Sequence, residues 1–386
     1  MRPSLLALAL AAVASAAAAP NSNSTATAAP SSTTAPNSTA SSPAPNPTAG
    51  ADSADETRTL EQLHAAALAE GGRVTLWHGG DLTNGGDDLK AAFEARFPGV
   101  VLNVTIDLSK YHDGRVDSAL ADAGELPDSV ILQTLHDYPR WDSERALLRY
   151  RPAGFSAIDN AYKDPWGAWY GVYVYSWSFV SSTAKTNATL AAWDDFLAPE
   201  LRDKLVLTYP NDDDAVLYLF DLLLRAYGEE WLDRLLAQNP RWVRGTGTPA
   251  LMVANASYPY AATFTSDVGW AAPPGLRVAK PSVGPFVSWA QTAAILQDAP
   301  HPEAAKLLHN YILSPEYQNG TGWQVRRDLP LPDGFPWAPL EDMHNTNPVD
   351  FARWMQDRGR VERLRFWFEN RLGTAQGVSP LVDPWS

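Results

Sequence analysis

Aromatic side chains recur at every second position between residues 172 and 180. The residues on this side are Tyr173, Tyr175, Trp177 and Phe179. A period of two predicts a β-strand, and aromatic and β-branched residues suit one. The ring-bearing face therefore packs into a core or lines a ligand cleft, and we expect roughly half of the rings to be core. Rings in a cleft attract organic cations by about 1–2 kcal/mol each.

Three consecutive carboxylates, Asp212 to Asp214, follow Asn211 and precede a strongly apolar segment, residues 215–227. We predict that this segment is a helix. Acidic side chains at a helix N-terminus cap its free N–H groups, which would account for one or two of the three. A carboxylate here that faces a ligand would repel phosphate or sulfate and would attract a cation.

Motifs of the common enzyme classes are missing from the sequence: it has no H-E-x-x-H, no G-x-S-x-G, no P-loop and no cysteine. Residues 245–250 formally fit G-x-G-x-x-A, but Pro249 interrupts the match and we do not expect residues 241–244 to form a buried strand. We interpret this segment as a helix start at which Thr246 contacts ligand. We predict no cofactor and no metal site. The carboxylates leave a two-carboxylate glycosidase as an alternative.

The first 56 residues differ in composition from the rest. An apolar run from Leu5 to Ala19 follows Arg2 and predicts a signal peptide, residues 1–19. Residues 20–56 are rich in Asn, Ser, Thr, Ala and Pro, which predicts a disordered linker because such a segment cannot bury a core. No second long apolar run follows, so we expect no transmembrane helix. We expect a secreted, extracellular protein.

Asn-X-Ser/Thr sequons in the globular part support a eukaryotic extracellular protein. They lie at Asn103, Asn187, Asn255 and Asn319, and we predict that they carry glycans. The net charge of −14 and the isoelectric point near 4.9 argue against nucleic acid and anionic membranes as partners.

Strands and helices alternate after residue 59. We expect helices at 59–70, 87–97 and 115–123, and strands at 74–77, 100–106 and 129–133. This order predicts a parallel α/β sheet, in which ligands bind beyond the carboxyl ends of the strands. That edge holds His78, Gly80, Asp81 and Gln133. A second alternation follows, with strands at 205–208 and 260–265, an extended segment at 285–296, and helices at 215–227, 229–238, 301–313 and 349–372, the last interrupted near Gly359.

Several sequence segments, by their order and spacing along the chain, resemble segments of the extracellular solute-binding proteins that serve ABC importers for iron, thiamine and polyamines. The segments are residues 63–77, 93–99, 167–175, 228–232, 239–247, 291–296, 299–307 and 313–316. Together they span most of residues 57–316. The resemblance implies an α/β, two-lobed type II periplasmic-binding-protein fold with crossing hinge strands and a ligand cleft between the lobes.

Boundaries follow from the resemblance. Lobe one would comprise residues 57–170 and 295–386, lobe two residues 180–288, and the hinge crossings residues 171–179 and 289–294. Trp289 would lie on the returning crossing, next to the ring-bearing face. The expected ligand-binding residues are His78, Gly80, Asp81, Gln133, Tyr173, Tyr175, Trp177, Asn211, Asp213, Thr246, Thr265 and Trp289.

Iron receptors of this family use adjacent tyrosines, where Phe264-Thr265-Ser266 stands in this chain. Ferric iron prefers phenolate and carboxylate oxygens, so this departure argues against iron. We therefore expect a monomeric, non-catalytic solute-binding protein that holds a small organic cation rather than iron or an oxyanion. Two alternatives stay open: a secreted carbohydrate-active enzyme that uses its rings as sugar platforms, and a ligand-free scaffold whose cleft is filled by side chains. The sequence indicates no transporter partner.

Overall fold

The computed structural model describes residues 54–266, 269 and 271–385. The predicted signal peptide and most of the predicted linker lie outside these residues. The last part of the linker is structured, contrary to the prediction. Arg151 forms an ion pair with Asp55 at 2.7 Å, and Arg58 forms one with Glu56 at 2.6 Å, because these acidic side chains find basic partners on the folded domain.

A seven-stranded sheet runs through the molecule in the order β2-β1-β3-β9-β4-β7, with β8 also paired to β4. The strands β1 (Arg73–Gly79), β2 (Val101–Asp107) and β3 (Ser129–Leu132) are parallel, which confirms the predicted parallel α/β pattern. The strand β9 (Ser288–Ile295) returns from the far end of the chain and is antiparallel to both β3 and β4.

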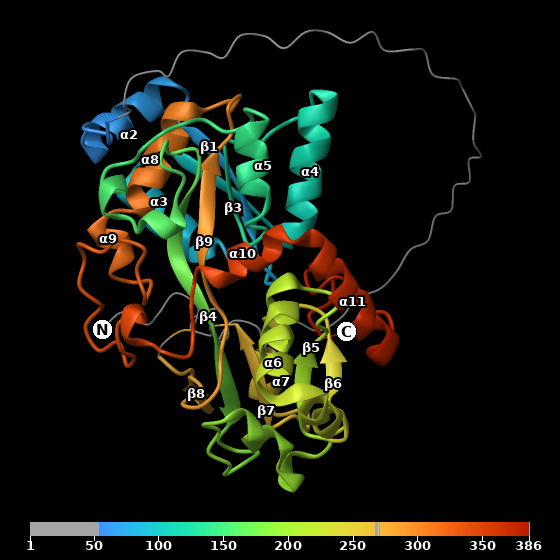
Figure 1. Ribbon diagram of the computed structural model, residues 1–386. Helices are drawn as coiled ribbons and strands as arrows, with labels where there is room; N and C mark the ends of the chain where they lie inside the picture. Colours follow the sequence, from blue (N-terminus) through green and yellow to red (C-terminus); the bar gives the residue numbers. More distant parts are fainter. Residues whose placement is uncertain (1–53, 267–268, 270, 386) are drawn as a thin grey trace, which may run out of the picture.

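Helices cover both faces of this part of the sheet (Figure 1). Ile131 faces the cluster that contains α2 (Leu60–Ala69), α3 (Asp87–Arg96) and α8 (Pro302–Ile312). Val130 and Leu132 face the cluster with α4 (Ser109–Asp122) and α5 (Asp137–Ser143). Alternate residues of β3 are thus buried on opposite sides, as a central strand of an α/β sheet requires.

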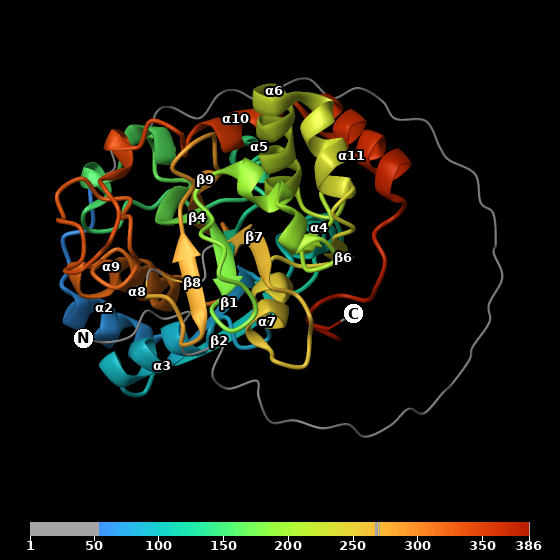
Figure 2. The same cartoon turned by 90° about the horizontal axis from the view of Figure 1, so that it is seen from below.

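The strand β4 (Tyr170–Ser182) crosses from one half of the molecule to the other (Figure 1). Residues 170–176 pair with β9, whereas residues 177–182 pair with β7 (Ala262–Ser266) and β8 (Leu276–Ala279). Figure 2 shows β4, β7 and β8 side by side when the molecule is seen from below. The aromatic stretch is therefore a strand shared by both halves.

The second half contains a two-stranded parallel sheet, β5 (Val206–Thr208) with β6 (Arg241–Val243), and the helices α6 (Asp214–Leu236) and α7 (Thr248–Ala254). The prediction that residues 241–244 form no buried strand is corrected in part, because β6 is a strand although only Val243 is buried. Gly228, at φ 76° and ψ 176°, divides α6 where the sequence predicts a break between two helices.

The C-terminal extension, residues 320–385, contains α10 (Asp350–Gln356) and α11 (Arg358–Leu372) and follows the short helix α9 (Pro315–Gln318). The break between α10 and α11 falls at Asp357, which caps α11 by accepting from Arg360 N, rather than at Gly359. These two helices, predicted in lobe one, also pack on α6 of the second half and lie across the middle of the molecule (Figure 1). The lobe boundaries remain a prediction.

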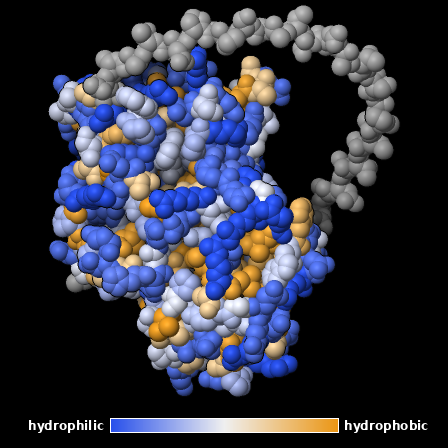
Figure 3. Space-filling model, viewed as in Figure 1, coloured by the Kyte–Doolittle hydropathy of each residue, from blue (hydrophilic) through white to orange (hydrophobic). Residues whose placement is uncertain are grey.

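Among the described residues, no helix is both long and apolar enough to span a membrane. The face in Figure 3 is largely hydrophilic, and its apolar side chains are gathered in separate patches.

Candidate functional site

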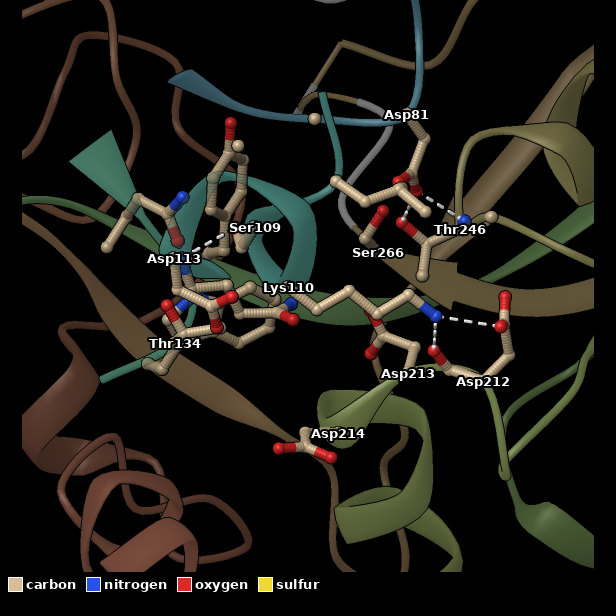
Figure 4. A pocket seen from close by; sticks show the side chains of 18 of the residues that line it. Asp81, Ser109, Lys110, Asp113, Thr134, Asp212, Asp213, Asp214, Thr246 and Ser266 are labelled. Carbon is tan, nitrogen blue, oxygen red and sulfur yellow. Dashed lines mark hydrogen bonds and ion pairs between the residues drawn. The ribbon is translucent and has the colours of Figure 1, made fainter. Parts of the chain in front are cut away.

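A cavity of about 240 Å³ lies between the two halves of the molecule (Figure 4). One wall comes from the segments that follow β1, β2 and β3. The opposite wall comes from the N-terminus of α6 and the loop before α7. The rest of the lining comes from the strands β4, β7 and β9 and the helices α10 and α11. The cavity therefore occupies the carboxyl edge of the parallel strands, where such sheets bind ligands.

His78, near the end of β1, presents a neutral imidazole to the cavity. Its Nε2 is hydrogen-bonded to the hydroxyl of Tyr173. Burial lowers the pKa of His78 to about 4, so the ring is uncharged near pH 7. Its Nδ1 has no hydrogen-bond partner among the described residues. The ring can thus exchange a hydrogen bond with a ligand without adding a charge.

A close approach of two segments fixes the backbone beside His78. A Cβ on Gly79 would lie 2.0 Å from Ser109 Oγ, so only glycine fits there. Ser109 Oγ in turn accepts from Gln133 N at 2.9 Å. These contacts join the segments after β1, β2 and β3 into one rigid wall.

Asp81 joins the two walls directly. Its Oδ2 accepts from Thr246 N and Thr246 Oγ1, both at 2.5 Å, and from Gly247 N at 3.3 Å. The Asp81–Thr246 contact is visible in Figure 4. The loops that hold Asp81 and Thr246 belong to different halves of the molecule. Their contact therefore means that the cleft between the halves is closed in this structure.

The three consecutive carboxylates have different partners. Asp212 forms ion pairs with Lys110 at 2.7 Å and with Arg244 at 3.0 Å. Asp214 forms ion pairs with two arginines of α11, Arg358 at 2.7 Å and Arg365 at 2.5 Å. These four bonds neutralise both carboxylates within the protein.

Asp213 lies between them and caps α6. Its Oδ1 accepts from Ala215 N at 2.8 Å and from Val216 N at 3.0 Å, as the capping prediction requires. Burial, together with the nearby charge of Asp81, raises the pKa of Asp213 to about 7. No Lys or Arg of the described chain forms an ion pair with Asp213.

Asp113 of α4 is a second carboxyl of this kind. Burial and the adjacent Asp137 raise the pKa of Asp113 to about 7. Within the residues that the structure describes, no basic side chain is paired with it. Asp113 and Asp213 are therefore two cavity carboxyls that form no ion pair with a Lys or Arg among the described residues.

The crossing strands supply aromatic rings. Tyr175 of β4 and Trp289 of β9 line the cavity, with ring centroids 5.5 Å apart. The indole Nε1 of Trp289 donates to Gln291 Oε1 at 2.8 Å, which fixes the ring. A ligand in the cavity thus meets two rings and several carboxyl groups.

Most of the predicted ligand-binding residues meet at this cavity. The eight that line it are His78, Gly80, Asp81, Gln133, Tyr175, Asp213, Thr246 and Trp289. Their roles in binding remain a prediction. The other four do not line the cavity.

The four exceptions have structural partners. Tyr173 lies behind His78, which its hydroxyl contacts, and Trp177 is buried against Trp289, with centroids 5.7 Å apart. The side-chain amide of Asn211 donates to Gly373 O at 3.0 Å, and Thr265 Oγ1 donates to Thr246 O. These four therefore do not line the cavity, and their role in ligand binding stays a prediction.

Sequence reasoning missed several cavity residues with polar side chains, among them Lys110, Asp113, His136, Arg358 and Arg365. The carboxyl-edge rule could have found the first two, because they follow β2 as Gly80 and Asp81 follow β1. Thr134, which the carboxyl-edge rule places beside Gln133 at the predicted site edge, also lines the cavity. The two arginines are distant in sequence, and no local pattern points to them.

The described residues contain no group of three or more His, Asp or Glu side chains arranged to hold a metal ion. Residues 150–319 match the family model of bacterial extracellular solute-binding proteins. No curated protein matches the sequence.

Solved structures with this architecture include iron-bound HitA from Pseudomonas aeruginosa, with a TM-score of 0.58 and 13% identity over 77% of this chain and 99% of that one. AfuA from Actinobacillus pleuropneumoniae, with fructose-6-phosphate bound, has a TM-score of 0.61 and 16% identity over 79% and 100%. The spermidine/putrescine-binding protein PotD from Streptococcus pneumoniae has a TM-score of 0.54 and 14% identity over 77% and 98%. The predicted two-lobed type II periplasmic-binding-protein fold and the resemblance to solute-binding proteins are confirmed.

Proposed function

We propose that this chain, which shares its fold with extracellular solute-binding proteins, is a secreted, non-catalytic receptor for a small organic cation. The observation that carries the proposal is the pair of unpaired carboxyls, Asp113 and Asp213, in a cavity that Tyr175 and Trp289 also line. A buried carboxylate without a counter-charge is costly, and a bound cation would offset that cost. The two rings would add cation–π attraction.

The charges of the cavity favour a cation over a simple anion. Lys110, Arg358 and Arg365 are already paired with Asp212 or Asp214, so an incoming anion would compete with those carboxylates. The cavity volume of about 240 Å³ is below the roughly 300–1,000 Å³ of drug-sized ligand pockets. A short amine or quaternary ammonium compound fits this space better than a large ligand does.

Iron is less consistent with the chain. Phe264 stands where the resemblance to iron receptors implies a tyrosine, and the described residues lack a clustered ligand set for a metal. The structural neighbours bind chemically different solutes according to their names, since one is iron-bound, one holds a sugar phosphate and one is a spermidine/putrescine protein. Fold alone therefore does not select the ligand.

The alternatives are less well supported. The comparisons do not favour a carbohydrate-active enzyme, since the matching family model describes solute-binding proteins. The cavity argues against a scaffold whose cleft is filled by side chains.

Native mass spectrometry of the secreted protein, followed by a thermal-shift panel, tests the proposal. We expect a co-purified organic cation and stabilisation by short amines or quaternary ammonium compounds. Ferric iron and phosphate should have no comparable effect. Stoichiometric iron, or stabilisation by phosphate alone, would overturn the proposal.

Asp213→Asn supplies the specific variant, because asparagine also caps helices while it removes the charge. It should weaken cation binding about tenfold. Asp233→Asn is the matched control, since Asp233 lies on the same helix and faces Arg371. Equal losses in both variants would contradict a role for Asp213.

We also propose that the chain is a monomeric glycoprotein. Three sequon asparagines, Asn103, Asn187 and Asn319, are exposed, and Asn255 is half-buried. Exposure supports glycan addition at the first three. Peptide mass analysis before and after enzymatic deglycosylation of the secreted protein tests this, and unmodified asparagine at all four positions would contradict it.

A further inference from the structure

We infer that the C-terminal extension, residues 320–385, is a strap that holds the cleft closed and slows the passage of solutes into and out of the cavity. The inference goes beyond the proposed receptor function, because it holds for any ligand. The extension begins where the match to the family model, residues 150–319, ends. Its contacts reach the first half of the molecule, the crossing strands and the second half.

The beginning of the extension is attached to the first half. Asp159 N donates to Val325 O at 3.2 Å, and the Asp159 carboxylate forms an ion pair with Arg327. Arg326 lies directly against Gly154, where an added Cβ would be 2.6 Å from the guanidinium carbon. This part of the extension therefore moves with the first half.

The middle of the extension contacts the segment that leads into β9. Thr346 Oγ1 donates to Phe286 O at 2.7 Å and is hydrogen-bonded to Ser288 Oγ at 2.7 Å. Phe286 N donates to Asn345 O at 3.0 Å, and the side-chain amide of Asn345 donates to Pro281 O at 2.8 Å. Because β9 pairs with β4, these bonds hold the start of the returning crossing strand.

Lys280 connects the extension with β4. Its Nζ donates to Ser176 Oγ at 2.6 Å and to Ser178 Oγ at 2.9 Å. The same ammonium group lies over two rings of the extension, 4.6 Å from the centroid of Trp337 and 5.4 Å from that of Trp323, which is a cation–π arrangement. The two serines flank the point where β4 changes its pairing partners. The extension therefore covers the crossing where a hinge between the halves would bend.

The helices α10 and α11 attach the extension to the second half. Trp354 Nε1 donates to Asp221 Oδ2 of α6 at 2.7 Å, and Arg360 Nη2 donates to the same oxygen at 3.0 Å. On β9, Trp289 packs against Phe351 of α10, with ring centroids 5.7 Å apart. The helix α10 thus contacts both a crossing strand and α6, and it lies across the middle of the molecule in Figure 1. Movement of α6 away from β9 would break one of these two sets of contacts.

The last residues of the chain reach the edge of the cleft. A Cβ on Gly245 would lie 2.8 Å from Pro380 Cγ and 3.5 Å from Asp81 Cβ. Gly245 directly precedes Thr246, whose backbone N–H and hydroxyl bind Asp81 across the cleft. The tail of the extension therefore packs beside the contact that joins the two walls.

A hinge that opens has to break the contacts that exist only in its closed state. The extension is attached to both halves and to the strands between them, so it supplies such contacts without any ligand. The open state is then rarely populated, and a solute enters or leaves the cavity only during these openings.

Thiol accessibility in the full chain tests the inference without a ligand, because the sequence contains no cysteine. Thr134→Cys places a thiol in the cavity lining, at a position that is 6% exposed. Val116→Cys places one in the core of the first half, at a fully buried position of α4, where a small apolar side chain is tolerated. Both thiols should react slowly with a neutral disulfide reagent such as dithiodipyridine, since one requires opening of the cleft and the other unfolding.

Two double variants loosen the strap outside the cavity. Asn345→Ala with Thr346→Val removes the side-chain bonds to the segment before β9. Trp354→Phe with Arg360→Gln removes the bonds to Asp221. Each double variant should raise the reaction rate of the cavity thiol by about fivefold or more and leave the rate of the core thiol unchanged.

Arg353→Gln is the matched control, because Arg353 lies on α10 but is exposed and forms its ion pair with Asp350 of the same helix. It should change neither rate. Unchanged rates of the cavity thiol in both double variants would overturn the inference. An equal rise in the rate of the core thiol would also overturn it, because the strap would then maintain the fold rather than the closed cleft. Neither result affects the cation receptor, which the binding measurements test separately.

Discussion

The two halves of strand β4 carry the same alternation of rings but lie in different surroundings. In the first half, Tyr175 borders the cavity and packs against Trp289. In the second half, Phe179 is enclosed by Trp193 and Phe196, with centroids 4.8 and 4.9 Å away. Alternation thus identifies the face of a strand, whereas the elements that cover this face determine whether its rings bind ligand or form the core.

The surroundings of the rings change at the point where β4 changes its pairing partners. Residues 170–176 pair with β9, and residues 177–182 pair with β7 and β8. Trp177 stands at the boundary and is only 1% exposed. Replacing rings on each side of this boundary therefore separates effects on stability from effects on binding.

The largest effect is expected from Trp177→Ala. Removal of a fully buried ring should lower the free energy of unfolding by about 3–5 kcal/mol, measured by urea denaturation. The loss has a structural origin, so ligand affinity of the folded fraction should change little. A destabilisation below about 1 kcal/mol would show that this half of the strand is not core.

Tyr175→Ala should change ligand affinity more than stability, the reverse of what we expect for Trp177→Ala. Loss of one cavity ring should weaken binding of a cationic ligand by about 1–2 kcal/mol, or roughly 5- to 30-fold. Calorimetry measures this, with Tyr258→Ala as control because Tyr258 stacks on Trp385 outside the cavity. If Tyr175→Ala leaves affinity unchanged, both halves of the face are core and the cation proposal loses its aromatic support.

Binding should also depend on pH through Asp113 and Asp213, the two cavity carboxyls without an ion pair among the described residues. Asp113 and Asp213 have pKa values raised to about 7, so both are mostly protonated at pH 6 and mostly ionised at pH 8. A cation prefers the ionised form, and its affinity should fall about tenfold per contacting carboxyl from pH 8 to pH 6. Asp213→Asn should flatten this dependence, and a flat profile in the wild type would exclude both groups.

The smallest effect is expected from Tyr173→Phe, which removes only the hydroxyl that contacts His78. We expect a loss of about 1 kcal/mol in the free energy of unfolding. Affinity should change less than in Tyr175→Ala, because Tyr173 lies outside the cavity lining. A larger loss of affinity in Tyr173→Phe would place the functional boundary elsewhere on the strand.

Local patterns in the sequence predict much of the fold and one wall of the cavity. The strand–helix alternation places β1 and β3, and the carboxyl-edge rule then places His78 and Gln133 together. The same reasoning cannot supply contacts between distant segments. Nothing near Arg365 indicates that α11 reaches the cavity, and nothing near Phe179 indicates that Trp193 and Phe196 enclose it. Both depend on how elements far apart in the chain pack together.

The C-terminal extension also has a consequence for the unfolding of the molecule. At its start, Arg327 N donates to Ala157 O at 2.9 Å in the first half, and further on, α11 is joined by ion pairs to α6 in the second half. Neither half can lose its structure without breaking contacts of the segment that both share. The molecule should therefore melt as a single cooperative unit, and its many contacts between distant residues should make refolding slow.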